Sequence, residues 1–136
     1  MPHLIIEYSD NLESVLTMED LVRDLHAAAV AQEALPTGGI RTRAVPRSLY
    51  QVADGDATNG FIYVTLRIGR GRPPETQKQI GEALFAALNR AVEPVFAGRP
   101  LSLGLEIQEI DPATRWKRSN IREYMAARGR PAGDTP

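Results

Sequence analysis

Cysteine is absent from this chain of 136 residues, and only two histidines are present, His3 and His26. The lack of cysteine excludes disulfides, thiol nucleophiles and zinc–thiolate sites. The two histidines lie far apart in the sequence, and nothing completes a metal set or a Ser-His-Asp triad around either of them. We interpret His26 as a structural or surface residue. His3 is expected to point away from residue 2, because neighbouring strand residues face opposite sides.

An excess of charge of one sign is also lacking, as are long apolar runs. The formal net charge is −1, so no overall field favours nucleic acid or an anionic membrane. No apolar stretch approaches the roughly 20 residues that span a bilayer, and the first residues do not form a signal-peptide pattern. Hydrophobic residues make up 43% and charged residues 24%. These features predict a soluble, cytoplasmic protein of one domain, without nucleic-acid or membrane partners.

The first half of the chain has the pattern of a strand, a helix and a second strand. Residues 3–8 predict a strand, which ends in the turn-forming residues 9–11. A helix is predicted from Thr17, which would cap it while Asp20 reaches back in a weak capping box. Apolar side chains recur at helical spacing until residues 35–39 (LPTGG) stop the helix. Residues 40–45 then predict the second strand.

The second half repeats this plan. Residues 61–68 (FIYVTLRI) give the strongest strand signal in the chain, because they are rich in β-branched and aromatic side chains. A glycine-arginine turn follows at residues 69–72, and residues 73–75 (PPE) predict the start of a helix. We expect Pro94 to end or kink that helix. Residues 101–110 alternate as a long final strand.

Two strand–helix–strand units predict an α/β fold, with a four-stranded sheet and two helices on one face. The opposite face would be a large apolar surface if left bare, so we expect an oligomer in which a partner chain covers it. Beyond residue 112, Trp116 and the apolar positions after it predict a short helix or arm with an aromatic anchor. We place the domain at residues 1–127 and expect residues 128–136 to form a disordered tail.

Pro2 follows the initiator Met1 directly and precedes the first strand. A small second residue allows an aminopeptidase to remove Met1, which would leave the proline nitrogen as a secondary amine. An ordinary α-amino group has a pKa of about 7.7–8.0, and burial or nearby cations lower it. A rigid amine on a strand is therefore a candidate catalytic base. Met-Pro is also a common processed start, and the spacing alone leaves both interpretations open.

Arginines form two further candidate sites. The turn at residues 69–72 (GRGR) lacks the third glycine of a dinucleotide fingerprint and the Gly-Lys-Ser/Thr of a P-loop, so nucleotide binding is not expected. Arg70 and Arg72 instead fit a smaller anion such as a carboxylate. Alternation places Arg41 and Arg43 on one strand face. Solvated side chains would explain Arg70 and Arg72 equally well, and they explain the strand cluster, which includes Arg47, more simply. No aromatic platform for nucleic acid accompanies these residues.

Four segments together resemble a known family. Residues 2–11 (PHLIIEYSDN), 39–43 (GIRTR), 53–55 (ADG) and 65–72 (TLRIGRGR) closely resemble the 5-carboxymethyl-2-hydroxymuconate Δ-isomerases of the tautomerase superfamily. The resemblance runs from Pro2 to about Met125. It implies a homotrimer whose sheets form a central barrel, and a cofactor-independent 1,3-proton shift. The implied reaction converts 5-carboxymethyl-2-hydroxymuconate to its 2-oxo isomer in homoprotocatechuate (aromatic compound) catabolism.

The resemblance also implies roles for single residues. Pro2 would be the base, and Arg41 and Arg72 would bind or polarise the carboxylate and 2-oxo groups of a small carboxylate substrate. Arg43 and Arg70 have weaker claims to substrate binding. Two alternatives remain: a related tautomerase acting on another oxo-enoate, such as a phenylpyruvate-type substrate, and a non-catalytic trimeric carboxylate-binding protein.

Overall fold

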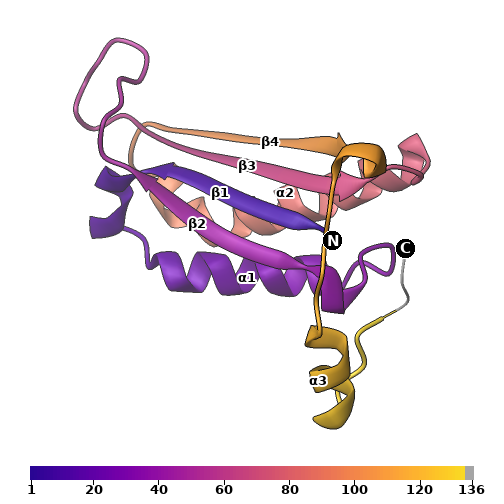
Figure 1. Cartoon of the computed structure of the whole chain (residues 1–136). Helices are drawn as coiled ribbons and strands as arrows, with labels where there is room; N and C mark the ends of the chain where they lie inside the picture. Colours follow the sequence, from indigo (N-terminus) through magenta and orange to yellow (C-terminus); the bar gives the residue numbers. More distant parts are fainter. Residues whose placement is uncertain (134–136) are drawn as a thin grey trace.

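The computed structural model describes residues 1–133 and forms one four-stranded sheet with two long helices on one of its faces (Figure 1). The strand order is β2-β1-β3-β4, so β1 and β3 are central and β2 and β4 are the edges. The strands are β1 (His3–Ser9), β2 (Arg41–Arg47), β3 (Gly60–Gly69) and β4 (Leu101–Ile110).

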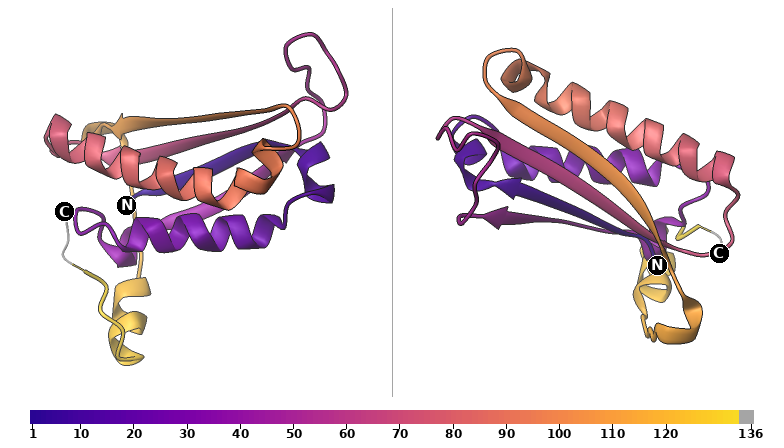
Figure 2. Two further views of the ribbon diagram at one scale, coloured as in Figure 1. Left: turned by 180° about the vertical axis from the view of Figure 1, so that it is seen from behind. Right: turned by 90° about the horizontal axis from the view of Figure 1, so that it is seen from above.

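The sheet consists of two parallel pairs of strands that lie side by side. β1 is parallel to β2 and β3 is parallel to β4, whereas the central pair of β1 and β3 is antiparallel. Helix α1 (Met18–Val30) connects the first pair and α2 (Pro74–Phe96) connects the second. Figure 2 shows both helices on the same side of the sheet. The predicted pair of strand–helix–strand units is therefore confirmed.

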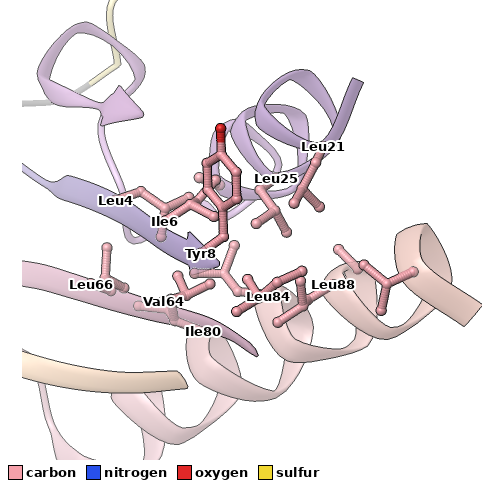
Figure 3. Close-up of a cluster of buried hydrophobic side chains, with 14 of the residues drawn as sticks. Leu4, Ile6, Tyr8, Leu21, Leu25, Val64, Leu66, Ile80, Leu84 and Leu88 are labelled. Atoms are coloured by element: carbon pink, nitrogen blue, oxygen red, sulfur yellow. The ribbon is translucent and has the colours of Figure 1, made fainter. Parts of the chain in front are cut away.

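The core lies between the sheet and these two helices (Figure 3). Alternate residues of the central strands point toward the helices, because successive strand side chains face opposite sides. Burial of each large aliphatic side chain stabilises the fold by about 1.5–3 kcal/mol. Side chains that are at most 2% exposed come from both halves: Leu4, Ile6, Leu21, Leu25, Val64, Leu66, Ile80, Leu84 and Leu88. No helix within residues 1–133 is long and apolar enough to cross a membrane.

The start of α1 differs from the predicted capping box. Thr17 occupies the N-cap position, but its side chain makes no capping hydrogen bond. The carboxylate of Asp20 forms an ion pair with Arg23, three residues further along the helix, and does not reach back. The predicted capping box is therefore wrong, because the acidic side chain has a cationic partner on its own helix.

Pro94 lies inside α2 and does not end it. A proline removes one backbone hydrogen bond, here in the last turn of the helix. The neighbouring bond from Ala97 N–H to the Glu93 carbonyl (3.0 Å) is present, and the helix continues to Phe96. Of the two predicted effects of Pro94, ending the helix is wrong, because one missing bond near the end is not enough to stop it, and a kink stays a prediction.

The face of the sheet that carries no helix is largely polar, and the prediction of a large apolar surface there is wrong. The strand register places His3 beside Arg41 and Arg67, and Glu7 beside Tyr63, on this face. Polar pairs form across it: Arg47 Nε donates to Glu7 at 2.6 Å and the Tyr63 hydroxyl donates to Glu106 at 2.6 Å. Ile5, Val45 and Phe61 are scattered among these polar residues. Because side chains alternate along each strand, the apolar residues point toward the helices and mostly polar residues lie on the other face.

The C-terminal segment forms an arm that projects from the end of the sheet (Figure 1). It contains helix α3 (Ile121–Ala127). Trp116 is 87% exposed, so it does not anchor the arm on this subunit, and packing of its ring on a neighbouring subunit stays a prediction. The segment expected to be disordered from residue 128 instead folds back as far as Gly133, because the Gly38 N–H donates to the Ala132 carbonyl at 2.7 Å. Residues 134–136 lie outside the described residues.

Candidate active site

A pocket of about 390 Å³ lies at the end of the sheet where β1 and β2 begin, close to the label N in Figure 1. Three segments of the chain form its walls: the residues before β1, the short 3₁₀ helix η2 (Thr37–Gly39) with its neighbours, and the arm ahead of α3. The lining residues are Met1, Pro2, Pro36, Gly38, Gly39, Arg41, Lys117, Arg118, Ser119 and Arg122. Of the five predicted site residues, Pro2 and Arg41 are therefore in the pocket.

Pro2 is buried immediately before β1. Its carbonyl accepts a hydrogen bond from the Arg41 N–H at 2.8 Å, which extends the β1–β2 pairing by one residue. A Cβ atom on Gly39 would lie 3.0 Å from Pro2 Cδ, the ring carbon bonded to the proline nitrogen. The absence of a side chain at residue 39 therefore makes room for the proline ring. The backbone on both sides fixes where the Pro2 nitrogen lies.

The electrostatic environment at this end of the chain disfavours an ammonium ion. The pKa of the Met1 amine is lowered from 8.0 to about 6. Burial is the main cause, because it removes water from the charged form. Four cationic side chains add repulsion, in decreasing order Lys117, Arg115, Arg72 and Arg41. The Met1 amine is therefore largely neutral at pH 7.

Arg41 is half-buried, and its guanidinium is held against the wall of the pocket. Its Nη1 donates to the carbonyls of Gly38 at 3.1 Å and Ile40 at 3.2 Å. These two bonds restrict the side chain before any ligand arrives. A guanidinium has five N–H donors, so further donors remain for an anion.

Arg72 is fixed in the same way but does not line the pocket. Its Nε donates to the Ala34 carbonyl at 2.9 Å and its Nη1 to the Gly69 carbonyl at 3.2 Å. Burial lowers the pKa of this guanidinium from its ordinary value. Arg72 is not among the residues that line the pocket, yet it is close enough to lower the pKa of the Met1 amine. Arg72 therefore lies near the site without forming part of the pocket lining.

Arg43 and Arg70 are not brought into the pocket. Arg43 is exposed on the polar face of the sheet, where its Nη1 lies 3.1 Å from His3 Nδ1. Arg70 is exposed and forms an ion pair with Asp111 at 3.5 Å. His26 is also elsewhere, with its Nδ1 2.8 Å from the Thr42 hydroxyl. Within the described part of the chain, no cluster of three or more His, Asp or Glu residues could hold a metal ion.

Sequence reasoning missed the basic residues of the arm. Lys117, Arg118 and Arg122 line the pocket, whereas the prediction of the arm rests on its aromatic and apolar residues. The available signal was the sequence RWKR at residues 115–118, which contains three cations in four positions. Such a short run has no periodicity that predicts where it packs.

The comparisons with known proteins agree on one family. The family model of 5-carboxymethyl-2-hydroxymuconate isomerase matches residues 2–125. A 5-carboxymethyl-2-hydroxymuconate Delta-isomerase of Escherichia coli is 33% identical over 121 residues, which cover 89% of this chain and 96% of that protein.

Solved structures extend the agreement to the fold. A 5-carboxymethyl-2-hydroxymuconate delta-isomerase matches with a TM-score of 0.86 and 31% identity, over 92% of this chain and 93% of that one. The corresponding isomerase from Deinococcus radiodurans R1 gives 0.83 and 40%, over 95% and 94%. A more distant match, a symmetric trimer of a fused 4-OT, gives 0.57 at 18% identity over 87% and 92%, and shows the fold alone. The chain therefore belongs to the 5-carboxymethyl-2-hydroxymuconate isomerase family.

Proposed function

We propose that this protein is a cofactor-independent isomerase that converts 5-carboxymethyl-2-hydroxymuconate to its 2-oxo isomer, in the cytoplasmic catabolism of homoprotocatechuate. The observation that carries the proposal is the position of Pro2, buried in a pocket that disfavours an ammonium ion and is lined by cations. Removal of Met1 would convert the nitrogen of Pro2 from an amide to a secondary amine. Family membership supplies the substrate.

The reaction requires a base that is neutral at rest. Isomerisation moves a proton from the 2-hydroxyl oxygen to a carbon of the diene, through a dienolate. One amine can accept the first proton and deliver the second if its pKa lies near the working pH. The Met1 amine, one residue away, has a pKa lowered to about 6 by burial and nearby cations. The same surroundings would keep a Pro2 amine unprotonated.

The arginines would stabilise the charge that develops. Negative charge accumulates on the 2-oxo oxygen of the dienolate, and fixed hydrogen-bond donors stabilise such an oxyanion without reorganising. Arg41 has this fixed geometry through its bonds to Gly38 and Ile40. We assign it to the 1-carboxylate and 2-oxo end of the substrate, with Arg72 behind it as a second cation. Arg43 and Arg70 lie outside this pocket, so we assign them no contact with substrate in the same subunit.

We also propose that the protein works as a homotrimer. The polar face of the sheet carries no helix, and both edge strands lack a neighbour within residues 1–133. The fused 4-OT, which has the same fold, is a symmetric trimer. Light scattering coupled to gel filtration would test this assembly, and a monomer at micromolar concentration would contradict it.

The decisive experiment compares protein that has lost Met1 with protein in which an alanine inserted before Pro2 keeps its nitrogen acylated. Mass spectrometry confirms which form is present, and ultraviolet absorbance follows the muconate. We expect the acylated form to lose about 10²–10⁴-fold in kcat/KM, the range for a general base. Equal rates for the two forms would refute Pro2 as the base.

Two further measurements separate the alternatives. Turnover of the enol of phenylpyruvate but not of the muconate would indicate a different tautomerase. Binding of the muconate without turnover would indicate a carboxylate-binding protein. For Arg41→Ala and Arg72→Ala, a change mainly in KM would indicate carboxylate binding, and a change mainly in kcat would indicate stabilisation of the transition state.

A further inference from the structure

The arm that leads to α3 contributes positive charge to the pocket. Lys117 and Arg118 line the pocket together with Pro2 and Arg41. Of the cations that act on the Met1 amine, Lys117 has the largest effect, ahead of both predicted site arginines. The arm therefore supplies charge to the place where the chemistry would occur.

These two cations have no hydrogen-bond partner within residues 1–133, whereas Arg122 of the same arm has two. Within residues 1–133 neither Lys117 nor Arg118 forms an ion pair or donates a side-chain hydrogen bond. Arg122, on the same arm, donates instead to the carbonyls of Ala132 at 3.3 Å and Gly133 at 2.8 Å. Lys117 and Arg118 are thus the arm residues whose donors face the pocket without a partner.

The arm is held in place, so its cations have a defined position. The Gly38 N–H donates to the Ala132 carbonyl at 2.7 Å, and Gly38 is itself part of the pocket wall. A Cβ atom on Gly38 would lie 2.9 Å from Ala132 Cβ, which shows how closely the returning segment packs. Arg122 also holds that segment through its bonds to the carbonyls of Ala132 and Gly133. We regard Arg122 as a positioning residue.

The charge of the proposed substrate indicates what these cations could bind. A muconate has two carboxylates and the carboxymethyl group adds a third, so the molecule is a tricarboxylate. Arg41 and Arg72 are assigned to its 2-oxo end, which leaves the carboxylates of the other end without a partner. A carboxylate desolvated in a pocket needs a cation or several hydrogen-bond donors.

We propose that Lys117 and Arg118 form a second anion subsite that binds the carboxylates at the end of the substrate remote from the 2-oxo group. This subsite selects tricarboxylates over substrates with a single carboxylate. The inference rests on the proposed function for the identity of the substrate, and on the geometry of the arm for the residues.

The test measures selectivity instead of activity alone. The Lys117→Ala/Arg118→Ala variant is assayed with 5-carboxymethyl-2-hydroxymuconate, with 2-hydroxymuconate, and with the enol of phenylpyruvate, which has one carboxylate. Exposed ion pairs contribute about 0.2–1 kcal/mol each, so the double variant should lose about tenfold in kcat/KM for the tricarboxylate. The loss should appear mainly in KM, be smaller for 2-hydroxymuconate, and stay within about twofold for the enol.

Three controls separate the subsite from a structural effect. Lys117→Arg keeps the charge and should retain most of the selectivity. Lys78→Ala removes an exposed lysine of α2 that pairs with Glu82. This variant should leave kcat/KM unchanged for all three substrates. The advantage of the wild type should also shrink at high salt, because exposed charges are screened. An equal loss on all substrates, or no loss on the tricarboxylate, would overturn the subsite.

Failure of the proposed function has a different signature. If the wild-type protein, freed of Met1, does not turn over the muconate, the proposed function fails while the subsite remains testable by binding. Calorimetry with tricarballylate, a tricarboxylate that cannot react, would then be compared with glutarate. Tighter binding of tricarballylate to the wild type than to the double variant would support the subsite, and equal binding would refute it.

Discussion

The two halves of the molecule share one plan but differ in what lies where their strands begin. In the first half, β1 begins directly after Pro2 and β2 begins at Arg41, beside the arm and its cations. In the second half, β3 and β4 begin at Gly60 and Leu101, at the opposite end of the sheet because β1 and β3 are antiparallel. There the Gly60 N–H donates to the Pro100 carbonyl at 3.1 Å, and Ser9 and Asn11 fill the space. The fold is repeated, but the pocket with a candidate base is not.

This difference distinguishes the residues that stabilise the sheet from the residues that form the candidate site. Both halves bury the same kind of aliphatic residues in one cluster. The candidate site instead depends on an end of the chain and on an arm outside the repeat. Changes in matched positions of the two halves should therefore have equal effects on folding and unequal effects on catalysis.

The largest effects should come from the shared core, and they should be alike. Leu25→Ala in α1 and Leu84→Ala in α2 each remove a fully buried side chain. Each should lower the free energy of unfolding by about 2–5 kcal/mol, because the cavity left behind adds to the lost burial. Urea denaturation measures both. A loss confined to one half would show that the halves do not share a single cooperative core.

Substitutions at the two ends of the sheet should differ in their effect on kcat/KM. Arg41→Ala should lower kcat/KM by about 10²–10³-fold, the cost of removing a donor to a developing oxyanion. Arg99→Ala removes an arginine at the opposite end, where its Nη2 donates to the Thr58 carbonyl at 3.2 Å. It should leave kcat/KM within about twofold. Steady-state kinetics at a temperature where both variants are folded would decide, and comparable losses would contradict the assignment of the site.

Two glycines provide a matched test of crowding. A Cβ on Gly39 would press on Pro2 Cδ at 3.0 Å, whereas one on Gly60 would meet Leu12 Cδ2 at 2.9 Å. Gly39→Ala should therefore reduce kcat/KM, by about tenfold for a displacement of the base. Gly60→Ala should instead cost about 1–3 kcal/mol of stability and spare the kinetics of the folded fraction. The reverse pattern would place the reacting group elsewhere.

The smallest expected effect is a shift in pH dependence. The neutral amine is the active form, so kcat/KM should fall as the pH decreases through the pKa of the Pro2 amine. Since the neighbouring Met1 amine has a pKa of about 6, this acid limb should lie well below the ordinary value of about 7.7–8.0. Arg41→Ala or Lys117→Ala removes a cation and should move the limb to higher pH. Arg99→Ala should leave the limb where it is. An acid limb that does not move in Arg41→Ala or Lys117→Ala either would contradict the electrostatic account.

The sequence allowed the repeated plan to be predicted because period-two and helical spacing record burial directly. Leu4 and Ile6 alternate with half-exposed residues, and Leu21, Leu25 and Ala29 follow one helix face. Pro2 and Arg41 were predicted through the resemblance of residues 2–11 and 39–43 to the isomerase family, because spacing alone left the role of each open. The contribution of Lys117 was not predictable, since it depends on how an arm without periodicity folds back through the Gly38–Ala132 hydrogen bond. The polar face was missed because the alternation was used for the buried side alone.

The two edges of the sheet have unequal tendencies to aggregate. Along β2, Pro46 has no N–H to offer, and three arginines project from the strand. These features block the growth of a sheet by edge-to-edge pairing. The opposite edge, β4, contains no proline and no lysine or arginine. A subunit without partners is thus vulnerable to uncontrolled strand addition at β4, so crowding, heating or dilution from denaturant should lead to aggregates that begin at residues 101–110.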